Sequence, residues 1–318
     1  MGAATEARSY KQIVEYFGGK VTDLVKPPMD TFGRGNEAGG YTDDFSSAFF
    51  CAEEIAKNHG IVDADAVKKA LIEWSTHAVF FDRFAGPTTR IAIRKFKGEK
   101  VEESVGTKNT ARSATNGSAM RISPIGLINA GNIEKAISDA AIVASITHDN
   151  DLAISGACAI AAAVCRASDD GADLYDVMNA GIYGAKKGAQ IGEVRGVVVA
   201  GPSVTKRIEI ACEIGFGRGS TEEKVRQISD VIGTGLHISE AVPSAFGITA
   251  ACNGDAMQTL IETVNIGYDT DTCATMSGAL AGTLQGADAF PEHFMPTMIQ
   301  VNGLDIEQLA RDIYALHH

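Results

Sequence analysis

The chain has 318 residues, which suits one large domain or two small ones with a sizeable buried core. Its hydrophobic content of 45% and charged content of 21% fit a soluble globular protein and exclude a disordered or fibrous chain. A net charge of -12 repels phosphate, so nucleic-acid polymers and anionic membrane surfaces are disfavoured as partners. Small molecules and cations remain as candidate binding partners.

The first residues lack the basic start and apolar stretch of a secretory signal, so we expect a cytoplasmic protein. The longest uncharged stretch, residues 152–165, is rich in Ala and shorter than the ~18 residues that span a bilayer. It predicts a buried helix. The six cysteines form no C-x-x-C pair, which indicates neither a zinc site nor a disulfide framework. We interpret them as small core residues.

Apolar residues recur at helical spacing in segment after segment. In chain order, this spacing predicts helices over residues 43–58, 64–81, 133–146, 152–167, 221–232 and 306–316. Gly60, Gly131 and Gly233 follow three of them and are the expected left-handed stops. The nearest strand pattern, residues 197–200, is too short and lacks a partner run. The sequence therefore predicts an all-α globule.

Several segments carry runs of Ala, Gly and Ser, as in GACAIAAAVC and ATMSGALAGTLQGA. Small residues let helix axes approach closely, so these runs predict central helices that other helices surround. The last helix has a single apolar stripe and is expected on the outside.

A first acidic group, Thr42, Asp43 and Asp44, follows a glycine-rich approach and opens a long helix. Thr is a good N-cap, and Asp in a first turn complements the helix dipole. Taken alone, the group is an ordinary helix start.

A second acidic group, Asp269, Asp271 and Thr272, opens a helix of small residues that must be buried. Burying the four acids of the two groups would cost several kcal/mol per charge unless cations neutralise them. The ligands offered are all oxygens, which favours Mg²⁺, Mn²⁺ or Ca²⁺ over Zn²⁺. Six oxygens with bridging carboxylates suit two ions.

Seven segments distributed along the chain can be compared with known families: GAATE, YTDD, NGSAMRISPIGL, ASITHDNDLAISGACAIAAAV, AVPSAFGI, GYDTDTCATMSGALAGTLQGADAFP and VNGLDIEQLA. In that order they resemble the ADP-ribosylglycohydrolase family, which includes enzymes that remove ADP-ribose from arginine or serine and the dinitrogenase reductase-activating glycohydrolases. TDD or DTDT alone would be weak evidence, but seven ordered segments argue against coincidence.

The resemblance implies one compact all-α domain over residues 1–318, with a binuclear Mg²⁺ or Mn²⁺ site in a central cleft. The two ligand sets are distant in sequence and would have to converge. Glu6 falls on the family's glutamate that serves as general base or gate, whereas the residues alone would indicate a solvated terminal acid. The metal ligands that the resemblance implies are Thr42, Asp43, Asp44, Asp269, Asp271 and Thr272, and the catalytic residues are Glu6, Asp43 and Asp271.

The segment from Asn116 to Arg121 falls on the family's loop that presents backbone amides and a small hydroxyl to the diphosphate and ribose. Without that resemblance it would be interpreted as a plain turn. His148 matches a family histidine that contacts the ligand, although alone it would be a helix-dipole partner. The substrate-binding residues implied are Asn116, Gly117, Ser118, Met120, His148 and Tyr268.

The chain departs from the family pattern in three places. Members usually have a further helix with a Gly-Asp pair before the position of Met1, so we expect this sequence to lack the family's first helix. Phe45 stands where the family often has Thr or Ser. Tyr268 replaces the second Gly of the common GGDTD, and we expect its ring to line the pocket on the leaving-group side.

The function predicted is metal-dependent hydrolysis of an ADP-ribosyl bond, with an ADP-ribosylated substrate or a small molecule as partner; a homo-oligomer is compatible with it. A hydrolase of a small N-ribosyl compound, such as a nucleoside or nucleotide, is the alternative. A non-catalytic ADP-ribose-binding or structural relative is the third reading, but loss of acids would mark it, and the four aspartates and Glu6 are present.

Overall fold

A computed structural model describes residues 1–101 and 113–317. Within these ranges the chain is helical and has no strand, and backbone pairing outside helices is confined to isolated bridges. The all-α prediction is confirmed. With η for short 3-10 helices, the elements are α1 (Gly2–Thr5), α2 (Tyr10–Phe17), α3 (Asp43–Lys57), α4 (Ala64–Trp74), α5 (Ala78–Phe81), α6 (Pro87–Phe96), η2 (Asn116–Ser118), α7 (Ser123–Ile128), α8 (Ile133–Ser145), α9 (Asp151–Ala167), α10 (Leu174–Arg195), α11 (Val204–Phe216), α12 (Thr221–Val231), α13 (Ile238–Ala251), α14 (Ala256–Ile266), α15 (Thr270–Gln285), η3 (Ala287–Ala289), α16 (Phe294–Asn302) and α17 (Ile306–Ala315).

The predicted helix over residues 64–81 is wrong, because the chain forms two helices there. The first, α4, ends at Trp74. Ser75 and Thr76 then donate their hydroxyls to carbonyl oxygens three residues back, at 2.6 and 2.8 Å, which offers the backbone a tighter turn than the helix. The other predicted helices are present, each with one end shifted by one residue.

The predicted left-handed stops are confirmed. Gly60, Gly131 and Gly233 have φ angles of 74°, 76° and 88°. Each follows a helix end, where a residue with a Cβ would be strained.

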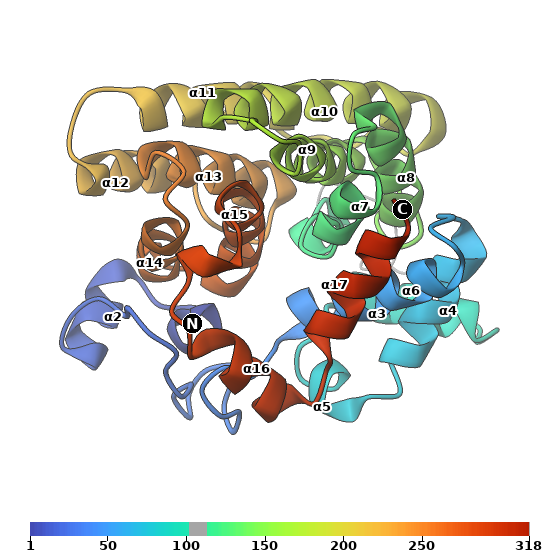
Figure 1. The fold of residues 1–318 in the computed structure, drawn as a ribbon, viewed down its shortest axis with the longest axis horizontal. Coiled ribbons are helices and arrows are strands. Elements are labelled where there is room, and N and C mark those ends of the chain that lie inside the picture. Colours follow the sequence, from blue (N-terminus) through green and yellow to red (C-terminus); the bar gives the residue numbers. More distant parts are fainter. Residues whose placement is uncertain (102–112, 318) are drawn as a thin grey trace.

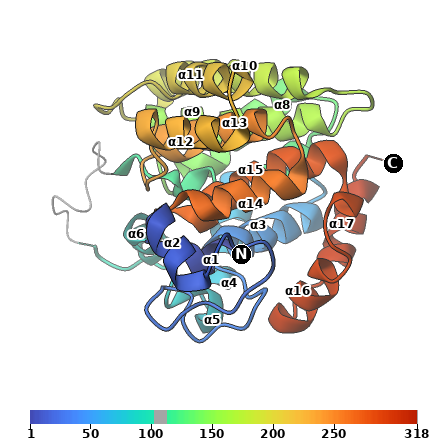
Figure 2. The same ribbon diagram turned by 90° about the vertical axis from the view of Figure 1, so that its left-hand side faces the viewer.

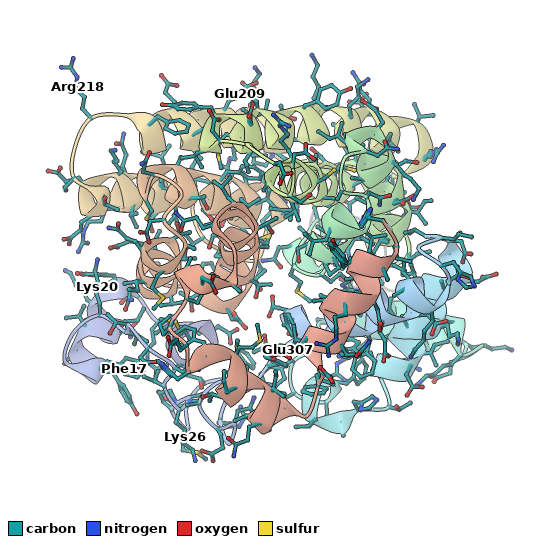
Figure 3. All side chains as sticks on the ribbon, in the orientation of Figure 1. Phe17, Lys20, Lys26, Glu209, Arg218 and Glu307 are labelled. Carbon is teal, nitrogen blue, oxygen red and sulfur yellow. The ribbon has the colours of Figure 1, made fainter. Side chains whose placement is uncertain are left out.

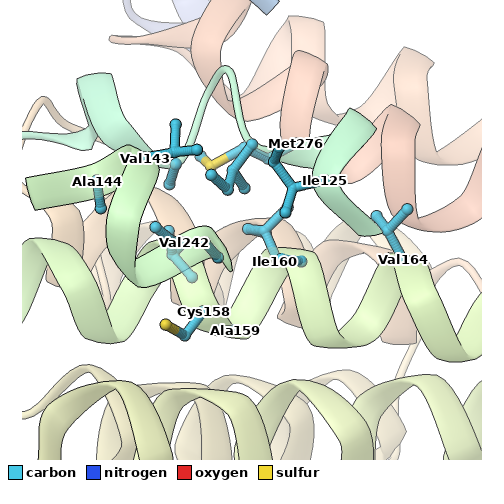
Figure 4. Packing of buried hydrophobic residues seen from close by; sticks show 14 of the residues in the cluster. Ile125, Val143, Ala144, Cys158, Ala159, Ile160, Val164, Val242 and Met276 are labelled. Carbon is cyan, nitrogen blue, oxygen red and sulfur yellow. The ribbon is translucent and has the colours of Figure 1, made fainter. Parts of the chain in front are cut away.

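Helix α9 runs through the middle of the molecule, with α7, α8, α10, α13 and α15 around it (Figure 1). Every residue from Leu152 to Cys165 is buried, as predicted for this small-residue segment. Ile160 of α9 lies among Ile125 of α7, Val143 of α8 and Met276 of α15 (Figure 4). These core contacts hold α15 against α9.

The remaining helices close the molecule around this core. Figure 2 shows the side on which α1, α2 and α14 lie, with α16 and α17 at the opposite edge. The last helix, α17, buries Leu309 and Ile313 and packs on α3, as expected for an outer amphipathic helix. In the described ranges, no helix is long and apolar enough to cross a membrane.

Helix α10 lies directly on α9 because glycines line the contact. A Cβ built on Gly184 would stand 2.4 Å from the carbonyl oxygen of Cys158, and one on Gly192 would stand 2.5 Å from the Cα of Asp151. Both distances are far below van der Waals contact with backbone atoms. The two backbones therefore pack against each other without intervening side chains.

We expect Gly184→Ala to destabilise the protein by about 1–3 kcal/mol, because the new methyl can be accommodated only if α10 moves away from α9. This would outweigh the better helix propensity of Ala, about 1 kcal/mol. Urea unfolding followed by circular dichroism measures it. Gly86→Ala is the control, since a Cβ there has no atom within 4 Å. Equal midpoints for Gly184→Ala and the wild type would contradict the tight contact.

Candidate metal centre

The two acidic groups stand at the first turns of α3 and α15, but their side chains do not act as helix caps. Thr42 is the N-cap residue of α3, and its hydroxyl donates instead to Oδ2 of Asp44 at 2.6 Å. Asp269 is the N-cap residue of α15 and likewise makes no side-chain cap bond. An ordinary helix start, the plain interpretation of each group, does not describe how these oxygens are used.

Helix α1 brings Glu6 to the start of α15. Thr5 and Thr270 share a hydrogen bond of 2.9 Å between their hydroxyls, and Thr270 donates to the carbonyl oxygen of Gly2 at 3.0 Å. A Cβ on Gly2 would stand 2.4 Å from the Cα of Asp271, so the backbones touch. Glu6 follows directly after α1.

As a result, the two acidic groups and Glu6 converge. Glu6, Asp269 and Asp271 each offer an oxygen, and these atoms lie within 4.8 Å of one another. Burial raises the pKa of Asp44 in α3, and the neighbouring side chains of Thr42, Thr272 and Asp271 oppose that rise. The cluster therefore joins three chain segments that are far apart in the sequence.

Three carboxylate oxygens of the cluster are buried without a hydrogen-bond partner: Oε2 of Glu6, Oδ1 of Asp44 and Oδ1 of Asp271. Unpartnered buried polar atoms are rare in folded proteins, because each one costs free energy. An all-oxygen donor set of this kind matches what Mg²⁺ and Mn²⁺ prefer. The residues present therefore fit a divalent metal site.

The pKa values show how strongly the fold opposes ionisation in the absence of cations. Burial, followed by the charges of Asp269 and Asp44, raises the pKa of Glu6 to about 8. Burial also raises the pKa of Asp269, to about 6, against the opposing hydrogen bond from Asn116 Nδ2 at 2.5 Å. For Asp43 and Asp271 burial likewise raises the pKa well above its ordinary value.

Arg121 is a buried cation behind this cluster. Its Nη2 donates to the hydroxyl of Thr89 at 3.0 Å, and its Nε has no partner. Burial raises the pKa of Asp43, and the charge of Arg121 opposes that rise. From the sequence alone, Arg121 is the last residue of the predicted substrate loop and a basic residue that could face a diphosphate. The sequence feature that could have indicated its burial is the position of a single Arg within the otherwise uncharged segment NGSAMRISPIGL.

The predicted substrate loop forms η2 beside the cluster. Asn116 lies closest to the acids, through its bond to Asp269, and its backbone N–H donates to the carbonyl of Leu236 at 3.0 Å. Ser118 points the other way and donates to the carbonyl oxygen of Ala153 in α9 at 3.3 Å. Met120 is buried. The hydroxyl of Ser118 is thus directed into the core and not toward the acids.

His148 lies under this loop. Its Nε2 bonds with the hydroxyl of Thr115 at 2.9 Å and its Nδ1 with that of Thr147 at 2.8 Å. Burial and the charge of Arg121 lower its pKa to about 3, so the ring is neutral. A Cβ on Gly117 would stand 3.0 Å from its Cε1. The structure therefore places His148 as a support for Gly117, with both ring nitrogens already engaged.

Tyr268 stands at the rim, between the cluster and a neighbouring cavity. It has a φ angle of 70° and is 56% exposed. Its backbone pairs with the N-terminal segment, since its N–H donates to the carbonyl of Arg8 and its carbonyl accepts from Ala7, each at 2.8 Å. Its ring lies against Gly235.

Residues 1–318 match the sequence profile of the family described as ADP-ribosylglycohydrolase. The chain belongs to the ADP-ribosylglycohydrolase family. The family that the sequence motifs indicated is thereby confirmed, and membership supports a glycohydrolase of ADP-ribosyl type.

Among relatives, an uncharacterised protein of Escherichia coli K12, YegU, is 32% identical over 276 residues, which cover 85% of this chain and 79% of that protein. Human ADP-ribosylhydrolase ARH3 is 26% identical, over 92% of this chain and 84% of its own length. A solved structure described as an ADP-ribosylglycohydrolase-related protein complex has a TM-score of 0.70 at 20% identity, over 100% of this chain and 93% of the other. It shows the shared fold.

For this family member we expect the metal-free protein to lose stability as the pH rises from about 4 to about 8. Unfolded Glu and Asp ionise at their ordinary pKa values of 4.5 and 3.8, whereas folded Glu6 and Asp269 keep protons until about 8 and about 6. The folded state then binds more protons, so its stability falls with pH, by about 1.4 kcal/mol per unit of pKa difference.

Thermal unfolding in chelator at several pH values measures this fall. Glu6→Gln removes the group that titrates highest, so its melting temperature should change less between pH 6 and pH 8 than that of the wild type. Glu307→Gln, on exposed α17, should keep the wild-type slope. If Glu6→Gln and the wild type had parallel profiles, the buried position of Glu6 would be refuted.

Proposed function

We propose that this protein hydrolyses an ADP-ribosyl bond with the help of two divalent cations, Mg²⁺ or Mn²⁺. The observation that carries the proposal is the convergence of buried carboxylates from α3, α15 and the end of α1, with three oxygens left without partners. The residues that would hold the cations are Thr42, Asp43, Asp44, Asp269, Asp271 and Thr272.

Bound there, divalent cations would supply positive charge that orients ribose hydroxyls and a water molecule and makes that water more acidic. Departure of the leaving group gives an oxocarbenium-like carbon, which the water captures. Glu6 is the proposed proton acceptor, because it borders the cluster and its Oε2 has no partner. Asp43 and Asp271 hold the arrangement on which this step depends.

The loop at η2 is the proposed binding element for the ADP-ribosyl part. Asn116 contributes its side-chain amide next to Asp269, and Gly117 can present backbone to a diphosphate because it lacks a side chain. His148 holds Gly117 in place from below. Tyr268, at the rim, borders the leaving-group side.

Similarity to human ADP-ribosylhydrolase ARH3 supports the proposal of an ADP-ribosylated substrate over that of a small N-ribosyl compound. A non-catalytic role fits the chain less well, since the full set of acids is kept and is gathered in one place.

Asp271→Ala is expected to abolish divalent-metal binding and to lower turnover by about a thousandfold, because several kcal/mol of charge stabilisation are lost. Titration calorimetry on metal-depleted protein measures the first, and release of ADP-ribose or ribose with Mg²⁺ or Mn²⁺ measures the second. Suitable substrates are ADP-ribosylated arginine and serine peptides, nucleosides and nucleotides. Asp288→Ala, exposed in η3, is the matched control.

Full activity of metal-depleted Asp271→Ala would refute the metal mechanism. Release from nucleosides or nucleotides alone would assign the small-molecule alternative, and release from none of the compounds by the wild type would assign a non-catalytic role.

A further inference from the structure

A cavity of about 510 Å³ lies next to the metal centre but is separate from it. Residues of α2, α12, α13 and α14 line it, together with the turn before α13 and the turn before α15. Gly267 and Tyr268 form part of its wall, whereas Glu6, Asp269 and Asp271 do not line it. Ala7 and Tyr268, which are joined by a backbone hydrogen bond, line the cavity, and each is next in sequence to an acid of the metal centre, Glu6 or Asp269.

The cations in the cavity wall already have carboxylate partners. The pairs are Arg8 with Asp30 at 2.5 Å, Lys20 with Glu262 at 2.7 Å and Arg226 with Glu222 at 3.4 Å. Two further carboxylates, those of Asp230 and Glu240, line the same wall. Neither has a cationic partner within 4 Å among the described residues. The wall therefore carries unbalanced negative charge, in a chain whose net charge is already -12.

Glu240 and Tyr268 lie together. A Cβ on Gly235 would stand 2.6 Å from Oε2 of Glu240 and 2.5 Å from Cε1 of Tyr268, so carboxylate and ring both cover this glycine. The N–H of Gly235 donates to Oε2 of Glu240 at 3.1 Å, which fixes the carboxylate in place. Among the described residues, the other oxygen, Oε1, has no hydrogen-bond or ion-pair partner, so it can accept from a ligand.

Elsewhere in the same cavity wall, a guanidinium group contacts both an aromatic ring and a carboxylate. The guanidinium of Arg226 lies 4.1 Å from the ring centroid of Tyr10 and 3.4 Å from the carboxylate of Glu222. An aromatic face together with a carboxylate suits a planar cation, because the ring attracts the charge and the carboxylate accepts hydrogen bonds in the plane of the guanidinium. An ammonium ion offers no such plane.

We propose that this cavity is a second binding site, which takes a guanidinium group against the ring of Tyr268 and the carboxylate of Glu240. The group belongs either to a small organic molecule or to an arginine side chain of a peptide. A volume of about 510 Å³ is within the range of small-ligand sites.

Titration calorimetry with n-butylguanidinium, in the presence of excess Mg²⁺, tests the site. The neutral n-butylurea has the same shape and should bind at least about tenfold more weakly, as should n-butylguanidinium to Glu240→Gln. The Gln oxygen can still accept from Gly235, so the fold is kept. Tyr268→Gly should also weaken binding, and Gly accepts the φ angle of 70° without strain.

Glu307→Gln is the matched control. Figure 3 shows Glu307 on α17, away from Lys20 in the cavity wall. This variant should bind the probe as the wild type does. Free arginine and a Gly-Arg-Gly tripeptide then distinguish the two sources, the tighter of them identifying a small molecule or a peptide side chain.

Equal affinity for n-butylurea, or unchanged affinity in Glu240→Gln, would overturn the proposal. So would competition by ADP-ribose, which would place the probe in the metal centre. Binding that depends on Glu240 and persists in Asp271→Ala supports a separate site even if the metal mechanism proves wrong.

Discussion

Repulsion among buried carboxylates is the constraint on which the rest of this structure depends. Glu6, Asp44 and Asp271 bring three carboxyl groups together out of water, and ionising each of them without a cation would cost several kcal/mol of desolvation. Helices carrying such charges would move apart unless other contacts prevented it. The packing of α9 against its neighbours supplies that restraint, because α10 meets α9 backbone to backbone and α15 packs on α9 through buried side chains such as Met276.

The same constraint explains local departures from ordinary helix chemistry. Thr42 and Asp269 occupy N-cap positions without capping, which leaves backbone N–H groups to other partners and frees side-chain oxygens for the cluster. Ala7 and Tyr268 adopt left-handed φ angles of 62° and 70° next to Glu6 and Asp269. Reciprocal backbone hydrogen bonds hold this pair, so the strain is maintained where the carboxylates are positioned.

Local pattern was enough to predict the fold class, the buried α9 and the acids of α3 and α15, because helix period and repeated acidic helix starts are written in neighbouring residues. Glu6 needed the family resemblance, since a single acid near the start has no pattern. The break after Trp74 was missed because Ser75 and Thr76 bond back to the chain. Likewise, only the tertiary fold shows that His148 supports Gly117, or that Phe45 packs 4.5 Å from the ring of Tyr41.

The candidate site has two parts, a floor formed by the acidic cluster and a rim at Tyr268. The floor of the site, defined by Glu6, Asp44, Asp269 and Asp271, consists of buried or half-buried acids whose negative charges raise pKa values within the group, so a change at any of them alters the charge balance of all. The rim is different, because Tyr268 is half exposed, its ring lies against Gly235, and it lines a cavity that Glu6, Asp269 and Asp271 do not line. A residue at the rim can vary without disturbing the carboxylates. Under the proposed function, we therefore expect selectivity for the group attached to the ribose to depend on residues around Tyr268, and bond cleavage to depend on the acids of the cluster.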